Sequence, residues 1–139
     1  MSDWNRGLID DLRAHEGHAT SGPFVGRQVL ILTTTGAKTG EAHPAPLAWT
    51  RSGDDIVVVA SMGGSPRNPS WFHNLVANPR VIVELDGERF EAIARVARPD
   101  ERRRLYDGHV EVHPGFREYE TKTSRVIPVV LLSRVATAS

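Results

Sequence analysis

The sequence predicts a small, mainly antiparallel β-barrel with short helical additions. Three observations lead to this fold class. Short apolar runs typical of strands recur along the 139-residue chain, and most neighbouring runs are separated by only a turn. The regular alternation of strand and helix that a doubly wound fold requires is absent. About six strands in a chain of this length are accommodated better by a barrel than by an open sheet.

The first half of the chain combines one helix with three strands. Apolar residues spaced four apart from Trp4 predict an amphipathic helix, which Ser2 or Asp3 caps and which ends near Gly17. The three strands are expected at residues 29–34, 46–50 and 56–60. Prolines in the second of these confine its start to a sheet edge or a bulge, because proline cannot donate a ladder hydrogen bond.

The second half adds a short helix, a hairpin and a last strand. Asn68 is expected to cap a short helix that has Pro69 at its first position, and Asn78-Pro79 ends that helix. The Asp86-Gly87 pair predicts a hairpin turn. Its strands are expected at residues 81–85 and 89–96, a charged helix begins at Pro99, a helical piece covers 116–121, and the last strand covers 127–132. The count is about six strands with three to four short helices.

The composition fits a single domain spanning residues 1–139. Apolar residues make up 40% and charged residues 24%, and 17 basic side chains balance 17 acidic ones. This balance gives no overall field for nucleic acid or an anionic membrane. Disulfides and thiolate nucleophiles are excluded because there is no cysteine. No apolar run approaches the roughly 20 residues of a membrane span, so we expect a cytoplasmic protein without stable membrane insertion.

The turn at residues 36–40 is the first candidate binding site. Gly36 and Gly40 permit left-handed backbone and close approach of a ligand. Lys38, with the hydroxyls of Thr35 and Thr39, supplies donors suited to an anion such as phosphate. The spacing differs from that of a P-loop, so hydrolysis of nucleoside triphosphates is not expected. A solvated hairpin turn with a surface lysine remains the alternative interpretation.

The loop at residues 61–69 is the second candidate. Gly63-Gly64 frees backbone amides, Arg67 adds charge, and Asn68-Pro69 directs a helix N-terminus toward whatever lies in front of it. Trp71 and Phe72 bring aromatic surface to the same place, although one of them is expected to pack in the core. Together the two loops suggest a long ligand, with an anionic tail at the first loop and a flat ring near the second.

Side chains for acid–base or metal chemistry are not recognisable as motifs. Histidines 43, 73, 109 and 113 do not form a metal signature, and no serine lies in a nucleophile elbow. This absence favours chemistry carried by a bound cofactor that the protein positions. The arginine run at residues 102–104 is expected to be a solvated face with local ion pairs.

Taken together, these motifs resemble the deazaflavin-dependent nitroreductase family, small split β-barrel reductases that use coenzyme F420. The resemblance covers nearly the whole chain and includes the segments 22–26, 30–40, 60–75, 78–79 and 127–130. It implies a split β-barrel fold and hydride transfer from reduced F420 to an electron-poor acceptor such as a quinone, an enone or a nitroaromatic.

The resemblance also implies a set of site residues. Lys38 and Thr39 are expected at the coenzyme phosphate, with Ala37 contributing backbone. The segment expected along the tail and ring is His43, Pro44, Ala45, Pro46, Leu47 and Ala48. Those expected to flank the deazaflavin are Val59, Ala60, Ser61, Met62, Ser70, Trp71, Phe72, His73 and Asn74. The acceptor is expected against His113, Phe116 and Tyr119, with Ser61 and Tyr119 as the catalytic candidates.

The chain departs from the family pattern at two places. The family often has Arg-Lys where this chain has Ala37-Lys38, and often a second arginine where it has His43. We therefore expect weaker binding of the coenzyme tail unless another arginine compensates. Members active on bulky nitroimidazoles have tyrosines in the segment matching 113–119. Phe116 lacks that hydroxyl, so we expect poor activity on bicyclic nitroimidazoles.

Two other functions fit the same fold. An FMN-binding reductase would need more cationic phosphate contacts than the sequence offers. A non-catalytic F420 carrier would keep the coenzyme site and close the acceptor side. A homodimer is possible, because split barrels often associate through sheet faces.

Overall fold

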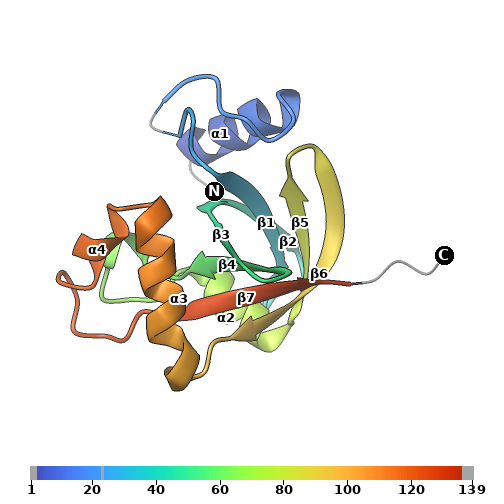
Figure 1. Cartoon of the computed structure of the whole chain (residues 1–139). Helices are drawn as coiled ribbons and strands as arrows, with labels where there is room; N and C mark the ends of the chain where they lie inside the picture. Colours follow the sequence, from blue (N-terminus) through green and yellow to red (C-terminus); the bar gives the residue numbers. More distant parts are fainter. Residues whose placement is uncertain (1–2, 23, 136–139) are drawn as a thin grey trace.

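A curled antiparallel sheet forms the centre of the protein (Figure 1). The computed structural model describes residues 3–22 and 24–135. Over these residues the sheet has seven strands in the order β2-β1-β5-β6-β7-β4-β3. The strands are β1 (Val29–Thr35), β2 (Ala42–Ala48), β3 (Thr50–Ser52), β4 (Asp55–Val59), β5 (Arg80–Leu85), β6 (Glu88–Val96) and β7 (Val129–Arg134). The helices are α1 (Asp3–Ala14), the short 3-10 helix η1 (Met62–Gly64), α2 (Ser70–Ala77), α3 (Pro99–Val112) and α4 (Phe116–Tyr119).

The sheet curls because its two edge strands are neighbours in the chain. β2 and β3 lie at opposite ends of the strand order, yet only Trp49 separates them. The Trp49 amide donates to the Gln28 carbonyl at 3.2 Å, and the Gln28 side chain donates back to the Trp49 carbonyl at 3.1 Å. The barrel class predicted from the sequence is confirmed. The single strand expected at 46–50 is instead two strands, since the curl breaks it at Trp49.

Strand β1 is buried on both faces, which explains its continuous apolar run. Val29 and Ile31 pack against α1, where Leu8, Ile9 and Leu12 form the apolar stripe. Leu30 and Leu32 face the opposite way, into the inner core. Figure 1 shows α1 lying over this part of the sheet and α3 crossing β7 at another. Each helix therefore covers its own section of the sheet.

Two further apolar clusters complete the packing. The inner core combines alternate residues of the curled sheet with Trp71 and Leu75 of α2. The second cluster lies between α3 and the outer faces of β4 and β7. Its buried members are Val57, Val59, Leu105, Tyr106, Val110, Ile127, Val129 and Leu131.

The hairpin predicted around Asp86-Gly87 is confirmed. Both turn residues have positive φ, 49° and 83°, as a type I′ turn requires. Gly17, just past the end of α1, lies against this turn, since a Cβ at Gly17 would be 2.8 Å from the Asp86 nitrogen. The glycine thus allows the end of the first helix to rest on the hairpin.

Some predicted details of the elements are wrong. Asn68 does not cap the second helix, because Pro69 is the N-cap residue and the Asn68 amide oxygen accepts from Arg125 instead. The last strand begins at Val129, since the Ile127 carbonyl accepts from Arg102 and does not join a ladder. Asp3 lies in α1 itself, whereas the alternative cap Ser2 falls outside the described residues.

The prolines of β2 explain its place at the edge of the sheet. Pro44 and Pro46 are two residues apart in β2, so their backbone nitrogens point to the same side of the strand. Because a proline nitrogen cannot donate a hydrogen bond, this side faces away from β1. Their prediction as edge residues is confirmed. Among the helices that the structure describes, none is long and apolar enough to cross a bilayer.

Candidate functional site

The turn between β1 and β2 is closed by its own backbone. The Gly36 amide donates to the Glu41 carbonyl at 2.8 Å, and the Gly40 amide donates to the Gly36 carbonyl at 3.0 Å. A Cβ at Gly36 would lie 2.6 Å from Thr39 Oγ1 and 2.8 Å from His43 Nε2. The hydroxyl and the imidazole therefore converge over the bare backbone of Gly36.

This turn, with the adjacent start of β2, presents donors to solvent. Ala37, Lys38, Thr39 and His43 are all exposed. Within the described part of the chain, the Lys38 ammonium has no hydrogen-bond or ion-pair partner. A turn that carries an unpaired ammonium together with an exposed hydroxyl and imidazole is able to bind a phosphate group.

Asn74 of α2 ties this turn to the rest of the candidate site. Its Nδ2 donates to Thr34 Oγ1 at 3.1 Å, and its Oδ1 accepts from the Ala37 amide, also at 3.1 Å. Asn78, just past the helix, donates to the Thr35 carbonyl at 3.4 Å. The buried Asn74 amide is thus bonded through both its nitrogen and its oxygen, and it positions the Ala37 backbone.

The second predicted loop follows β4 and holds a left-handed backbone. Met62 has a φ of 46° and is 55% exposed, and Gly64 has a φ of 82°. A Cβ at Gly64 would lie 2.8 Å from Lys122 Cβ and 3.0 Å from the Tyr119 carbonyl. The loop therefore packs directly against the segment around the end of α4.

An open hollow of about 510 Å³ lies beside this loop and α2. Its lining residues are Met62, Arg67, Asn68, Ser70 and His73. Because α2 carries both Ser70 and His73 of the hollow and the Asn74 that holds the turn at residues 36–40, one helix joins the two loops. The structure thus brings together the two candidate sites that lie far apart in the sequence.

Several predicted site residues bury their side chains. Trp71 is 8% exposed and belongs to the inner core. Val59, Ala60 and Ser61 are also buried at the end of β4. Phe72 is half-buried against the same core and meets the exposed His73 ring edge-on at 5.9 Å.

The remaining predicted coenzyme residues lie on β2. The segment Pro44 to Ala48 is partly exposed along the sheet edge, with Ala45 and Leu47 packed against the inner core. A strand in this place offers alternating backbone groups to a flat ligand.

In the segment predicted to contact the acceptor, Phe116 and Tyr119 are half-buried with their rings 5.0 Å apart. The Lys122 ammonium lies 5.7 Å from the centre of the Tyr119 ring. His113 is 3% exposed, and its Nε2 donates to the Trp49 carbonyl at 3.0 Å. The centre of the buried His113 ring lies 6.0 Å from that of the Phe116 ring, so His113 packs on the interior side of Phe116.

A second buried histidine, His109, also contacts Phe116, with the two ring centres 4.5 Å apart. It is 0% exposed, its Nδ1 lies 3.1 Å from Thr50 Oγ1, and its Nε2 is buried without a partner among the described residues. Burial first, and then the charge of the neighbouring His113, lowers the pKa of His109 to about 3. The imidazole is therefore neutral and belongs to the packing of α3.

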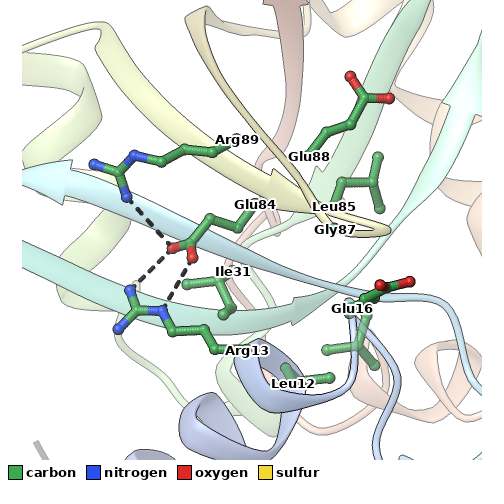
Figure 2. Close-up of a pocket in the computed structure, with 11 residues that line it drawn as sticks. Leu12, Arg13, Glu16, Ile31, Glu84, Leu85, Gly87, Glu88 and Arg89 are labelled. Atoms are coloured by element: carbon green, nitrogen blue, oxygen red, sulfur yellow. Dashed lines mark hydrogen bonds and ion pairs between the residues drawn. The ribbon is translucent and has the colours of Figure 1, made fainter.

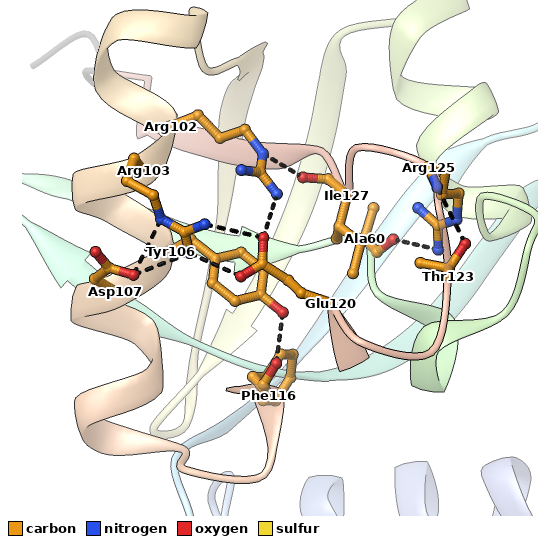
Figure 3. A network of polar contacts seen from close by, with 10 residues as sticks. All are labelled: Ala60, Arg102, Arg103, Tyr106, Asp107, Phe116, Glu120, Thr123, Arg125 and Ile127. Carbon is orange, nitrogen blue, oxygen red and sulfur yellow. Dashed lines mark hydrogen bonds and ion pairs between the residues drawn. The ribbon is translucent and has the colours of Figure 1, made fainter. Parts of the chain in front are cut away.

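The arginine run on α3 is more than the solvated face that the sequence predicts. Arg102 has a side chain only 15% exposed and donates to the Ile127 carbonyl at 2.8 Å and to Glu120 at 3.0 Å. Arg103 donates to both Glu120 oxygens (Figure 3). These hydrogen bonds, that of Arg103 first, hold the pKa of the Glu120 carboxyl below its usual range. The expectation of a solvated face is wrong for Arg102.

Two polar residues that the sequence analysis did not single out act near the site. The Tyr106 hydroxyl donates to the Phe116 carbonyl at 2.6 Å, and burial raises the pKa of Tyr106 to about 12. Arg125 bonds the loop after β4, 57 to 65 residues away in the chain. Nothing in the local sequence marks an isolated arginine for such a role.

A different hollow, between α1 and the β5–β6 hairpin, contains none of the predicted site residues. Its volume is about 200 Å³. Figure 2 shows Arg13 and Arg89 on either side of Glu84, at 2.9 Å and 3.8 Å from its carboxylate. The central carboxylate is thus paired from both sides, which indicates a structural ion cluster.

Comparison with known proteins gives a consistent result. The family model described as F420H(2)-dependent quinone reductase matches residues 4–134. An F420H(2)-dependent quinone reductase of Mycobacterium tuberculosis is 42% identical over 108 residues, which are 76% of this chain and 72% of that protein.

Two solved structures are similar over most of their length. An F420-H2 dependent reductase (FDR-A) superposes with a TM-score of 0.71 at 38% identity, covering 77% of this chain and 95% of its own. A structure described as a domain-swapped dimer has a TM-score of 0.72 at 32% identity, covering 92% and 93% of the two chains.

Proposed function

Because the chain belongs to the F420H(2)-dependent quinone reductase family, we propose that it transfers a hydride from reduced coenzyme F420 to a quinone. The observation that carries this proposal is the family match over residues 4–134, together with the turn at residues 36–40 that Asn74 joins to α2. The bound reduced deazaflavin supplies the hydride, and the protein supplies position and shelter from water.

The residues of the first turn fit the phosphate and acidic tail of this coenzyme. Lys38 supplies a fixed positive charge without an internal partner among the described residues. Thr39 and His43 converge over Gly36, where a side chain would block close approach. Asn74 fixes the Ala37 backbone next to them. Arg67, in the hollow by the second loop, adds a further positive charge.

The deazaflavin ring belongs at the hollow beside the second loop. Met62, Ser70 and His73 line this hollow and offer polarisable, hydroxyl and imidazole groups to a flat ring. Phe72 lies next to His73, and buried Trp71 supports the helix from the core. The partly exposed edge of β2 completes the walls, and the buried residues Val59 and Ala60 support them from the end of β4.

The acceptor side is formed by Phe116 and Tyr119. Their half-buried rings provide an apolar surface for an electron-poor ring, and the Tyr119 hydroxyl and Ser61 are the candidates for hydrogen bonds to the acceptor. Enones and nitroaromatics share the electron-poor character of a quinone, so we include them among the acceptors. Bicyclic nitroimidazoles are reduced poorly, because Phe116 has no hydroxyl to orient them.

Assembly as a homodimer is part of the proposal. It is supported by the solved structure at 32% identity that is described as a domain-swapped dimer. Size-exclusion chromatography with light scattering measures the mass directly.

A fluorescence titration tests the coenzyme site. Purified apo-protein is titrated with oxidised F420 and, separately, with FMN. We expect selective F420 binding, and a roughly tenfold loss of affinity in Lys38→Ala, as expected when one charge-assisted contact is removed. Arg134→Ala is the matched control, since it removes one positive charge from an exposed pair with Glu88. A preference for FMN, or equal effects of the two variants, would contradict the proposed site.

A further inference from the structure

Arg125 lies in the segment that joins α4 to β7, and its guanidinium donates hydrogen bonds to the loop after β4. Nε donates to the Ser65 carbonyl at 2.8 Å, and Nη1 donates to Asn68 Oδ1 at 2.7 Å. Nη2 donates to the Ser61 carbonyl at 2.7 Å and to the Ala60 carbonyl at 3.2 Å. One side chain therefore holds acceptors at both ends of the loop 60–68.

The shape of a guanidinium makes this possible. Its planar fork directs several N–H groups at once, whereas the ammonium of lysine is a single point of charge. The four acceptors belong to residues spread over the whole loop. A lysine at this position keeps the charge but cannot reach all of them together.

The loop 60–68 needs support from outside itself. Met62 has a left-handed φ of 46°, which is unfavourable for a residue with a side chain. Within the loop, the Gly64 amide donates to the Ser61 carbonyl, the Ser65 amide to the Met62 carbonyl, and the Arg67 amide to Ser65 Oγ at 3.3 Å. Strained backbone persists where the surroundings hold it, and such positions cluster at ligand sites.

The segment that carries Arg125 is itself anchored to α3. Figure 3 shows Arg102 and Arg103 reaching Glu120 and the Tyr106 hydroxyl reaching Phe116. Gly64 of the loop packs against this segment at Tyr119 and Lys122. The segment 116–125 therefore touches α3 at one side and the loop at the other.

From this geometry we propose that Arg125 is a positioning residue for the reductase reaction. It holds the loop 60–68 in the conformation that receives the deazaflavin ring and ties that loop to the acceptor-side segment 116–125. This inference rests on the proposed function for its consequence in turnover. Its structural part, the fixing of the loop, applies to the protein without coenzyme.

The test compares Arg125→Lys and Arg125→Gln with Arg80→Lys, whose arginine forms an exposed ion pair with Glu91 on a different part of the sheet. Three quantities are measured for each variant. They are amide hydrogen exchange of the loop 60–68 in the apo-protein, the Kd for oxidised F420, and the kcat and KM for menadione.

We expect faster exchange confined to the loop in both Arg125 variants, and a loss of F420 affinity of roughly tenfold or more in Arg125→Gln. Arg125→Lys should recover part of this loss, because it keeps the charge without the fork. Asn68→Ala removes a single acceptor and leaves the backbone carbonyls, so it should raise the exchange of the loop 60–68 by a smaller amount, and exchange is its readout because Asn68 also lines the hollow. It keeps the proposal testable if the Arg125 variants do not fold.

The proposal is overturned if Arg125→Gln exchanges and binds F420 like the Arg80→Lys control. It is also overturned if exchange rises uniformly over the protein while the folded fraction binds F420 normally, because that result describes general stability only. Glu120→Gln weakens the contact of the segment 116–125 with α3 and leaves the bonds of Arg125 to the loop. It should therefore raise the KM for menadione, while exchange of the loop 60–68 stays near the wild-type value. If the wild type binds no F420, the proposed function fails, and loop exchange still decides the role of Arg125.

Discussion

Acidification from about pH 7.5 to about pH 5 should destabilise this protein chiefly through His109. The ring is 0% exposed, and burial lowers its pKa to about 3. Its Nδ1 is bonded to Thr50, while Nε2 has no partner in the described residues. A protonated ring would therefore bury both a charge and an unpaired N–H group, which is costly.

The sign and the size of the effect follow from this pKa. The unfolded chain takes up a proton near the ordinary histidine pKa of about 6.5, whereas the folded protein resists it down to about 3. Stability is thus complete above the unfolded value and falls as the pH drops through this interval. At about pH 5 the loss amounts to about 2 kcal/mol, or roughly 5–10 °C in Tm.

Urea denaturation at the two pH values measures this loss. His109→Gln removes the titrating group, so its stability should vary much less with pH even though its stability at neutral pH is lower. His18→Gln, which changes an exposed histidine, should keep the wild-type dependence. The carboxylates with lowered pKa, such as Glu120, respond mainly at lower pH. An unchanged pH dependence in His109→Gln would refute the reasoning.

Three further changes have defined outcomes. Gly64→Ala should lose more stability in urea than Gly53→Ala. Both positions have positive φ, which costs about 1–2 kcal/mol for alanine, but only at Gly64 does the new Cβ meet neighbouring atoms; equal losses would contradict this. His43→Arg should bind F420 roughly tenfold more tightly at low salt and lose that gain at high salt, because it adds a fixed charge to the first turn; a titration without any gain would remove His43 from the tail site. Phe116→Tyr should increase the rate of bicyclic nitroimidazole reduction while menadione turnover changes little, and robust nitroimidazole turnover by the wild type would show that the missing hydroxyl is unimportant.

Much of the fold follows from local signals in the sequence. The Asp86-Gly87 turn, the alternating strands on either side of it and the edge position of the prolines in β2 each depend on neighbouring residues, and the structure confirms them. The break at Trp49 depends on how far the sheet curls. The loss of Asn68 as a helix cap depends on Arg125, 57 residues away. Competition between distant partners is not visible in a local pattern.

The candidate site also has a part that local sequence predicts and a part that it does not. The sequence predicts the two loops from their glycines, charges and aromatics, and it suggests that one long ligand uses both. The link between the loops could not be derived, because the partners of Asn74, Ala37 and Thr34, lie 37 and 40 residues before it in the chain. The burial of His113 is equally hidden, since its partner is a backbone carbonyl at the strand break. The roles of the individual site residues remain predictions.

Hydride transfer is tested most directly by mixing the purified protein with reduced F420 and menadione. The return of the oxidised coenzyme is followed by its visible absorbance. The account predicts oxidation at a rate proportional to protein concentration and dependent on the quinone, with no comparable rate when reduced FMN replaces F420. Tight binding of F420 without oxidation by any quinone, enone or nitro compound would contradict it and would indicate a coenzyme carrier.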